Sequence, residues 1–341
     1  MFGLTNKLRG RTGSPGEPGP VGPMGPQGPT GPAGPPGRDG TAQLSGSRSI
    51  QQVGHTLYVD NQDYLDPAIY GRKGAGIVFD SLEEALTVVR QGDTIGIYGK
   101  IDESNLRMAG QRSTVTDVTL IGMGTRTRPG HGEESAMAGG ADWSSAKDLA
   151  NAPLLTVISQ GWRFENIHFG GKITLSRTTD MMESGSHTEF LRCTFSGGPI
   201  GIEDHGGSTN TGIFGCHFYG FNKPGQMAIK STSTAMAWPL WWEIIGNRFI
   251  HNHGHIQLAL SNGIVSGNTF FMQGPEPDQR NAIALDLSAG KNNCASHNNF
   301  CCPAGEPVYA GTAYKMGSGD AWGPNYCSNG EVYGLPYKET K

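Results

Sequence analysis

Short alternations of apolar and polar residues recur through the second half of the chain, and six of them end on a phenylalanine. Successive phenylalanines of this set are 26, 23, 31, 21 and 30 residues apart. Period-two alternation directs each phenylalanine and the residue two positions before it to one face of a strand, so the variable spacing places insertions in turns. The six triplets are Ile167–Phe169, Cys193–Phe195, Cys216–Phe218, Asn247–Phe249, Asn268–Phe270 and Asn298–Phe300.

A further alternating run lies between consecutive triplets, so each unit of roughly 20 to 30 residues holds at least two short strands and no helix. These runs are Lys172–Leu175, Ile200–Ile202, Met227–Ile229, Ile256–Leu260 and Ile283–Leu287. Such units predict the coils of a parallel β-helix, in which every coil buries its apolar face on its neighbours. An antiparallel sandwich is the other all-β interpretation, but it would not require the same triplet in every unit.

The positions two before each phenylalanine predict ladders inside this β-helix. Cys193 and Cys216 would stack in adjacent coils as packing residues rather than as nucleophiles. Asn247, Asn268 and Asn298 would form an inward ladder. Their amides would bond along the helix axis and to turn backbone, which satisfies groups that are costly to bury.

Ahead of these coils, residues 81–90 predict a short amphipathic helix, with Ser81 near its start and Gly92 just past its end. Its apolar face would carry Leu82, Ala85, Leu86 and Val89. Strand-like alternation follows at Gly92–Tyr98 and again at 118–124. The helix therefore gives way to strands.

The helix, the Gly-Asp-Thr-Ile entry at 92–95, the strand at 118–124 and the Asn-x-Phe coils resemble the pectin-lyase-like right-handed β-helix. This superfamily includes pectate lyases and the trimeric tailspikes of bacteriophages. The resemblance covers about residues 77–305 and implies an all-β fold, a right-handed parallel β-helix. The chain departs from the tailspike pattern at its N-terminus, where a short peptide replaces a sizeable particle-binding domain.

The N-terminal part of the chain differs from the rest in its regular glycine repeat. Of the 53 glycines in 341 residues, eleven occupy every third position without a break. Only glycine fits the axis where three polyproline-type strands meet, so this period predicts a collagen-like triple helix and a homotrimer. A disordered Pro/Gly linker is the alternative, but a linker needs no strict period. The eleven residues are Gly10, Gly13, Gly16, Gly19, Gly22, Gly25, Gly28, Gly31, Gly34, Gly37 and Gly40.

Proline occupies the third position of these triplets only at 15, 18 and 36. Hydroxyproline would stabilise an animal collagen at that position, so its scarcity favours a bacterium or a virus of bacteria as the maker. At roughly 3 Å per residue, the run would form a stalk about 90 Å long.

The nine residues before the repeat combine apolar and basic side chains, namely Phe2, Leu4, Lys7, Leu8 and Arg9. They lack a continuous apolar run, so we expect no cleavable leader and interpret them as a peptide that anchors the stalk to capsid or tail proteins. The chain has no stretch of 18 consecutive apolar residues, so we expect no membrane insertion. The near balance of 26 basic and 30 acidic residues disfavours nucleic acid as a partner.

These patterns divide the chain into five segments. They are the anchoring peptide at 1–9, the collagen-like stalk at 10–40, a neck with the short helix at 41–90, the parallel β-helix at 91–302 and a C-terminal cap at 303–341.

Glu203, Asp204 and His205 are the strongest cluster of chemistry-bearing residues, and we place them at the turn of a coil. Glycoside hydrolysis uses two carboxyl groups about 5 to 10 Å apart, which makes Glu203 and Asp204 the catalytic candidates. Partners on neighbouring coils would be Asp180, Glu183, Glu189 or Glu243. A charged, solvated turn is the alternative interpretation. An acidic calcium-binding motif with an arginine at a fixed offset, as a pectate-type lyase would need, is not found.

Half of the six tryptophans fall within five residues, at Trp238, Trp241 and Trp242. Aromatic faces stack on sugar rings, and tryptophan is also enriched at protein interfaces. With His205, these residues predict a glycan-binding platform or the trimer interface.

Two further clusters lead to no metal prediction, and we expect no cofactor. His251, His253 and His255 would share one face of a continuous strand, but the core pattern that resumes at Ile256 places the first two in a turn. Four cysteines lie near the C-terminus, Cys294, Cys301, Cys302 and Cys327. The adjacent pair among them lacks the spacing of zinc ligands, which leaves burial and late disulfide formation open.

The sequence thus predicts a homotrimeric appendage on the surface of a bacteriophage particle, made in the host cytoplasm, that adheres to host-surface or environmental polysaccharide. Three weak sites on one stalk would gain avidity. A polysaccharide depolymerase on the same fold, with Glu203 and Asp204 as acid and base, is the alternative. A bacterial spore-surface or secreted adhesin is a third hypothesis, which the missing leader disfavours.

Overall fold

A computed structural model gives the fold of the C-terminal part of the chain. It describes residues 54–71, 76–107, 115–123, 141–144, 152–177, 184–206, 208–232, 239–271, 283–301, 314–327 and 332–333. All of these belong to one compact unit, residues 50–341. The predicted anchoring peptide at 1–9 and the predicted stalk at 10–40 lie outside the described residues.

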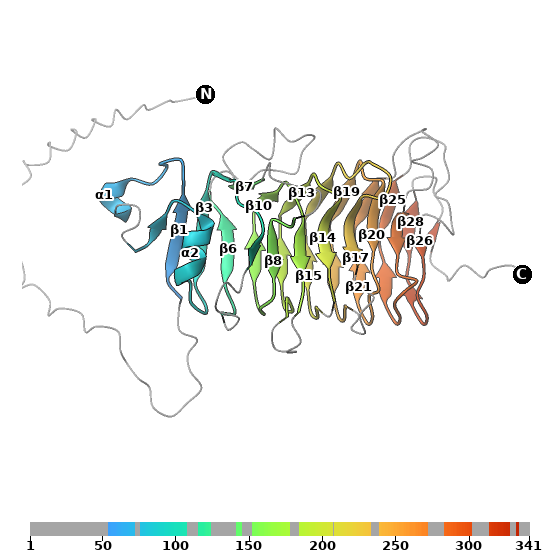
Figure 1. Cartoon of the computed structure of the whole chain (residues 1–341). Helices are drawn as coiled ribbons and strands as arrows, with labels where there is room; N and C mark the ends of the chain where they lie inside the picture. Colours follow the sequence, from blue (N-terminus) through green and yellow to red (C-terminus); the bar gives the residue numbers. More distant parts are fainter. Residues whose placement is uncertain are drawn as a thin grey trace, which may run out of the picture. The chain divides into compact units, whose positions relative to one another are not determined.

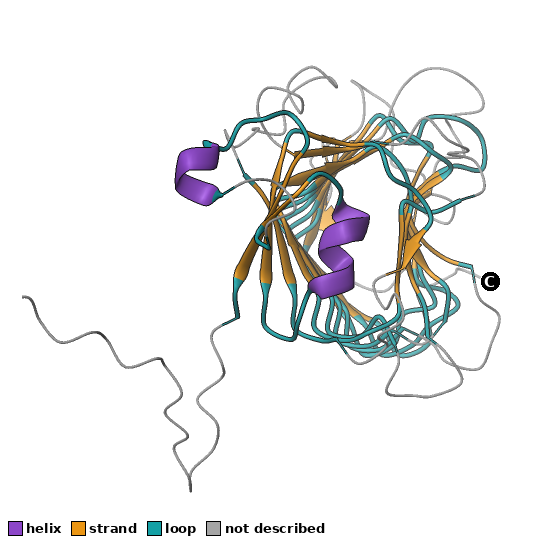
Figure 2. Ribbon diagram, turned by 60° about the vertical axis from the view of Figure 1, so that its left-hand side comes forward, coloured by secondary structure: helices purple, strands orange, loops and turns teal. Residues whose placement is uncertain are grey.

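The unit is mostly β-structure, and its strands form three long sheets that run side by side (Figures 1 and 2). Within the described residues, the first sheet has 11 strands, the second 10 and the third 8. Every neighbouring pair is parallel except the last pair of the second sheet. This is the arrangement of a parallel β-solenoid, which confirms the predicted architecture at that level.

The first sheet, in spatial order, consists of β2 (Val78–Phe79), β1 (Thr56–Asp60), β3 (Thr94–Tyr98), β6 (Thr119–Gly122), β9 (Arg163–Glu165), β12 (Glu189–Leu191), β15 (Gly212–Phe214), β18 (Glu243–Ile245), β21 (Ile264–Ser266), β24 (Cys294–Ser296) and β27 (Ala321–Trp322). The second consists of β4 (Lys100–Ile101), β7 (Ala141–Trp143), β10 (Ile167–Phe169), β13 (Thr194–Ser196), β16 (His217–Tyr219), β19 (Arg248–Ile250), β22 (Thr269–Phe271), β25 (Asn299–Cys301), β28 (Asn325–Cys327) and β29 (Val332–Tyr333).

The third sheet consists of β5 (Leu106–Arg107), β8 (Leu155–Val157), β11 (Ile173–Leu175), β14 (Ile200–Asp204), β17 (Met227–Ser231), β20 (Gly254–Gln257), β23 (Ile283–Asp286) and β26 (Tyr314–Lys315). Strands that follow one another along the chain, such as β12, β13 and β14, enter the three sheets in turn. Each such coil therefore holds three strands, which agrees with the expected minimum of two.

The six phenylalanines predicted to face inward do so, and they form one column along the second sheet. They pair in register from Phe169 to Phe300, and all are buried. Successive rings stack with centroids 4.7 to 5.1 Å apart. A column of this kind removes six large apolar side chains from water, each worth about 1.5 to 3 kcal/mol.

The predicted asparagine ladder is confirmed and is longer than expected. Asn247, Asn268 and Asn298 each donate a side-chain hydrogen bond of 3.0 Å to the next rung, and Asn325 is the last acceptor. The backbone N–H of each rung donates to the same oxygen. Each side chain also donates to a backbone carbonyl, which gives the buried amide a full set of partners.

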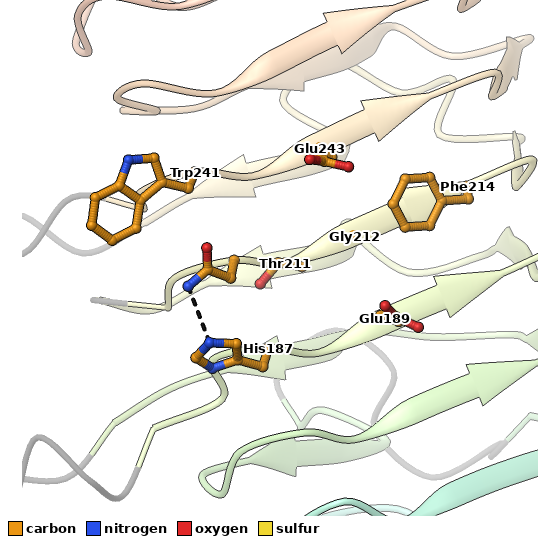
Figure 3. A pocket seen from close by; sticks show the side chains of 8 residues that line it. His187, Glu189, Thr211, Gly212, Phe214, Trp241 and Glu243 are labelled. Carbon is orange, nitrogen blue, oxygen red and sulfur yellow. Dashed lines mark hydrogen bonds between the residues drawn. The ribbon is translucent and has the colours of Figure 1, made fainter.

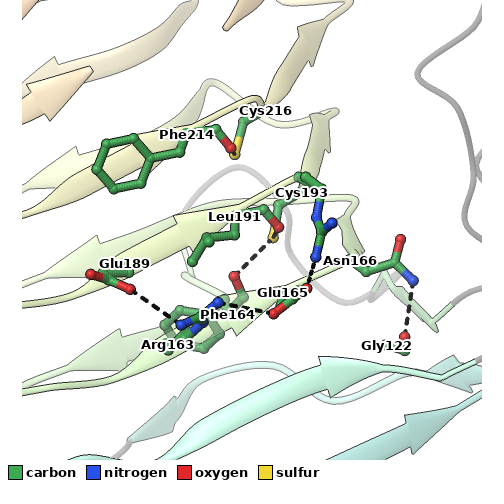
Figure 4. A network of polar contacts seen from close by, with 11 residues as sticks. Gly122, Arg163, Phe164, Glu165, Asn166, Glu189, Leu191, Cys193, Phe214 and Cys216 are labelled. Carbon is green, nitrogen blue, oxygen red and sulfur yellow. Dashed lines mark hydrogen bonds and ion pairs between the residues drawn. The ribbon is translucent and has the colours of Figure 1, made fainter. Parts of the chain in front are cut away.

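Cys193 and Cys216 occupy the earlier rungs of this row and are buried, as predicted. The Cys193 thiol contacts the carbonyl oxygen of Phe164 at 3.5 Å (Figure 4). The Cys216 thiol contacts the carbonyl oxygen of Phe190 at 3.4 Å. Burial raises the pKa of the Cys216 thiol well above its usual value, which disfavours the nucleophilic thiolate. Nearer the C-terminus, Cys294 is exposed and Cys301 is half-buried. Cys302 and the side chain of Cys327 lie outside the described residues.

The predicted helix is α2 (Leu82–Val88), and Ser81 caps it by accepting a hydrogen bond from the Glu84 N–H. It packs against β1 and β2, and the predicted apolar positions Leu82, Ala85 and Val89 are buried there. The Glu103 carboxylate accepts hydrogen bonds from two N–H groups of its first turn, a favourable site for an anion. A one-turn helix, α1 (Pro67–Tyr70), precedes it. The described helices include none that is long and apolar enough to cross a membrane.

The sheets extend beyond the expected range of 91–302 at both ends. Strands β1 and β2, from the expected neck, pair with each other, and β1 also pairs with β3. Strands β26, β27 and β28, from the expected cap, add one strand to each sheet. These strands lack the phenylalanine triplet, and most are only two or three residues long, so the sequence pattern does not reveal them.

Candidate functional site

The predicted catalytic pair does not form a site. Glu203 and Asp204 lie within strand β14 and are buried, not at a solvated turn. Consecutive residues of a strand point to opposite faces, so the two carboxyl groups face away from each other. Asp204 pairs in register with the inward Leu175, whereas Glu203 pairs with Thr174. The expectation that they act together is therefore wrong for a geometric reason.

Glu203 is held by three neighbours on the outer face of the third sheet. Its carboxylate lies 2.8 Å from Lys172 Nζ and accepts hydrogen bonds from Thr174 and Thr232 at 3.0 and 2.8 Å. Burial alone would raise the pKa of Glu203, but these contacts outweigh it and hold the pKa below its usual value. The partners tie β11, β14 and β17 together, and the group is a structural carboxylate.

Asp204 is 1% exposed and accepts a hydrogen bond of 2.6 Å from Ser208. Burial raises its pKa to about 6, because the hydrogen bonds only partly offset the cost of desolvating the charge. The native state therefore binds a proton here more strongly than the unfolded chain does. This contribution to stability is complete below about pH 4 and is lost as the pH rises through about 6.

Replacing Asp204 with asparagine is expected to flatten part of the pH dependence of stability. Asparagine keeps an acceptor for Ser208 and carries no charge. Relative to the wild type, the variant should gain about 1 to 2 kcal/mol of unfolding free energy between pH 5 and pH 8. Urea unfolding at the two pH values measures this difference. An equal pH dependence in both proteins would contradict the raised pKa.

The predicted aromatic cluster is divided by the fold. Trp242 is fully buried, and its indole N–H donates to the Ser208 carbonyl at 3.2 Å. It is a core residue and presents no surface to a sugar or a partner chain, so that expectation is wrong. Trp241 is 52% exposed. His205 is exposed and contacts Thr232 at 3.3 Å, whereas Trp238 lies outside the described residues.

Trp241 lines a groove of about 390 Å³ on the outer face of the first sheet (Figure 3). Strands β12, β15 and β18 form its floor, and the turns that precede them form one end. We call this the Trp241 groove; its lining residues are His187, Glu189, Asn210, Thr211, Gly212, Phe214, Trp241 and Glu243. The groove thus combines an exposed indole with carboxylate, imidazole and amide groups.

Register places two carboxylates on either side of a glycine in this groove. Glu189 pairs with Gly212, and Gly212 pairs with Glu243. Adjacent strands are about 4.8 Å apart, so the Cα atoms of the two glutamates lie about 10 Å apart. A Cβ on Gly212 would meet the ring of Phe214 at 2.2 Å, so this glycine lets the ring lie across the floor. Asp180 and Glu183, the other partners predicted for Glu203, lie outside the described residues.

Charges beside the groove fix one of these carboxylates. Arg163 Nη1 lies 3.9 Å from Glu189, and Nη2 of the same side chain lies 3.3 Å from Glu165 (Figure 4). Arg192 also pairs with Glu165. These half-exposed pairs contribute little to stability. They do direct one oxygen of Glu189 toward β9 and leave the other for a ligand.

The backbone at Trp241 is in the left-handed region, with φ of 55°. Equivalent turn positions in neighbouring coils hold Asn210, Asn262 and Asn292, with φ of 52°, 55° and 56°. The N–H of each residue bonds to the next coil. Asparagine tolerates this conformation, but for a bulky residue it is an outlier that costs on the order of 1 kcal/mol. A tryptophan at this position is therefore unfavourable for folding and points to a role on the surface.

The histidine cluster places His251 and His253 in a turn and His255 in β20, as expected. His255 is buried beside Phe249 and Phe270. Burial lowers its pKa to about 3. Among the described residues, no three His, Cys, Asp or Glu side chains gather as metal ligands would.

Comparisons of the chain with protein-family models, with curated proteins and with solved structures found no match. The functional proposal therefore depends on the residues and geometry of the Trp241 groove.

Five of its lining residues are not among the candidates from the sequence, namely His187, Asn210, Thr211, Gly212 and Phe214. His187, Asn210 and Phe214 come from two different coils and meet only because of the register. The sequence signal at this end of the groove is the turn residue that precedes each first-sheet strand. Three coils have asparagine there, one has His187 and one has Trp241.

Proposed function

We propose that this chain is a glycan-binding appendage, in which the Trp241 groove stacks on a sugar ring. The main support for this proposal is the exposed indole of Trp241. It lies at a turn position with strained backbone, beside a groove that also contains Glu189 and Glu243. Aromatic faces pack on the apolar faces of sugars, and carboxylates accept hydrogen bonds from hydroxyl groups. The groove offers both kinds of contact at once.

The collagen-like repeat supports a multivalent version of this proposal. A triple helix over residues 10–40 would join three copies of a right-handed parallel β-helix and three grooves. Linked sites bind a repetitive polymer far more tightly than one site does. The predicted setting is the surface of a bacteriophage particle, with residues 1–9 in a capsid or tail protein. Immunolabelling of purified particles would test that setting.

The first experiment is binding of the purified full chain to bacterial surface polysaccharide, with polymer length followed by size-exclusion chromatography. We expect retention on the polysaccharide and no shortening of the polymer. The protein is expected to sediment as a trimer, three times 36.2 kDa. Sedimentation as a single chain would remove the multivalent part of the proposal, and absence of binding to any polysaccharide tested would remove the whole.

Hydrolysis of the polymer is the second candidate, and the pair of glutamates favours it over other chemistry. Inverting glycosidases hold two carboxyl groups roughly 6.5 to 9.5 Å apart, and Glu189 and Glu243 lie on strands two apart, with Cα atoms about 10 Å from each other. If the polymer shortens, the Glu189→Gln and Glu243→Gln variants decide the origin. Loss of shortening with retained binding would assign hydrolysis to the groove, and unchanged shortening would exclude it.

A further inference from the structure

A second cluster lies on another face of the molecule, on the second sheet. Asp142, His168 and Ser196 come from the three neighbouring strands β7, β10 and β13. Nδ1 of His168 lies 2.7 Å from Asp142 Oδ1, and Nε2 of the same ring lies 2.8 Å from Ser196 Oγ. A hydroxyl, an imidazole and a carboxylate therefore form one continuous hydrogen-bonded chain.

The direction of these two hydrogen bonds follows from the ionisation state of the Asp142 carboxyl group. Burial alone would raise the pKa of Asp142, but hydrogen bonds from His168 and Ser144 outweigh it and hold the pKa below its usual value. An ionised Asp142 has no proton to give, so His168 Nδ1 carries the proton and donates it. In the neutral ring Nε2 then accepts the hydrogen bond from Ser196 Oγ.

All three side chains are shielded from solvent although they lie on the outer face of their sheet. Asp142, His168 and Ser196 are 6%, 7% and 6% exposed. The low dielectric constant of this buried setting strengthens both hydrogen bonds, from His168 to Asp142 and from Ser196 to His168. Because Ser196 is only 6% exposed, we expect a small substrate to react with it faster than a bulky one.

The backbone after the serine offers a site for negative charge. Gly197 and Gly198 both have positive φ, 71° and 74°. Neither N–H donates a hydrogen bond to another described residue. The N–H of the residue after a nucleophilic serine is a common donor to the oxyanion of acyl transfer.

We propose that Ser196 is a nucleophile for acyl transfer, with His168 as its general base and Asp142 as the residue that positions the imidazole. The substrate class is a small carboxylic ester, such as an acetyl ester of an alcohol. This activity is separate from glycan binding in the Trp241 groove, which lies on the first sheet.

The reaction balances without any cofactor. Ser196 Oγ attacks the ester carbonyl carbon while its proton passes to His168 Nε2, and the oxyanion that forms is held by the Gly197 N–H. The carbon–oxygen bond to the alcohol breaks, and His168 gives the proton to the leaving oxygen. Water then attacks the acyl-serine and gives a proton to His168, so the carboxylic acid departs and Ser196 recovers its proton.

The test treats the full chain with a fluorophosphonate probe and locates the adduct by peptide mass spectrometry. We expect one adduct, on Ser196, and labelling at least 100-fold slower in the His168→Gln variant. The Asp142→Asn variant, with the carboxylate removed, should also label slowly. Ser266→Ala changes a half-buried serine of the first sheet and should label as the wild type does.

A second measurement follows 4-nitrophenyl acetate, which should be cleaved by the wild type and not by Ser196→Ala. Circular dichroism and thermal unfolding check that each variant is folded. If the His168→Gln variant does not fold, the labelling rate of a folded Asp142→Asn variant is compared with that of the wild type instead. No adduct on Ser196 in the folded wild type would overturn the proposal. An adduct that forms at the same rate in a folded His168→Gln variant would overturn it too.

Discussion

Replacing Asn268 with alanine is expected to destabilise the solenoid by about 3 to 5 kcal/mol, because the change leaves several buried partners unpaired. The backbone N–H of Asn247 loses its acceptor, the side-chain amide of Asn247 loses one of its two acceptors, and the Ile244 carbonyl loses a donor. The Asn298 side chain also loses a contact from the ladder. Urea unfolding followed by circular dichroism measures the difference.

The matched control is Asn299→Ala. Asn299 is the same residue type on the neighbouring coil, but its side chain is exposed on the outer face of β25. Exposed substitutions of this kind change stability by about 0.5 kcal/mol or less. If Asn268→Ala and Asn299→Ala differed by less than about 1 kcal/mol, the ladder would not be a major source of stability.

Replacing Trp241 with asparagine is expected to weaken polysaccharide binding at least tenfold while making the protein more stable. Loss of a central aromatic contact commonly costs about 2 kcal/mol of binding free energy or more. Asparagine occupies the equivalent turn position in three other coils, so it relieves backbone strain of about 1 kcal/mol. Retention on immobilised polysaccharide and urea unfolding give the two readouts. A gain in stability with a loss of binding would separate function from folding.

Tyr326→Ala provides the control for this variant, because Tyr326 is 47% exposed and lies on the second sheet, away from the groove. It should bind as the wild type does. Sedimentation of both variants distinguishes the two roles predicted for Trp241. If Trp241→Asn bound polysaccharide normally but failed to form the trimer, the indole would be an interface residue instead.

The repeating coils can be predicted from the sequence because each coil has the same pattern of inward-facing residues. Phe249 must face inward, and Asn247 must find partners for its amide inside the same layer. Period-two alternation then fixes the faces, and recurrence fixes the parallel pairing. Strands such as β28, in which Cys327 pairs with Phe300 and so takes the place of the phenylalanine, carry no such pattern, and the sequence predicts a cap there instead.

The candidate sites were less accessible, because they depend on which residues of different coils share a face. Glu203 and Asp204 are adjacent in sequence but point to opposite faces of β14. By contrast, Glu189 and Glu243 are 54 residues apart in sequence, and only the register across Gly212 brings them into one groove. Sequence proximity therefore does not show which carboxyl groups share a face of the solenoid.

The contacts of His168 illustrate the same limit. Its two hydrogen-bond partners lie 26 and 28 residues away, close to one coil in each direction. The length of a coil varies along this chain because of insertions in turns, so the offset between stacked residues is not constant. Only the pairing of β7, β10 and β13 shows that the three side chains meet.

The most direct test of glycan binding in the Trp241 groove is a crystal structure of the full chain soaked with an oligosaccharide fragment of a polysaccharide that it retains. We predict a sugar ring stacked on the Trp241 indole, with its hydroxyl groups hydrogen-bonded to Glu189 or Glu243. An oligosaccharide bound elsewhere on the molecule, with the groove empty or covered by another subunit, would contradict the account.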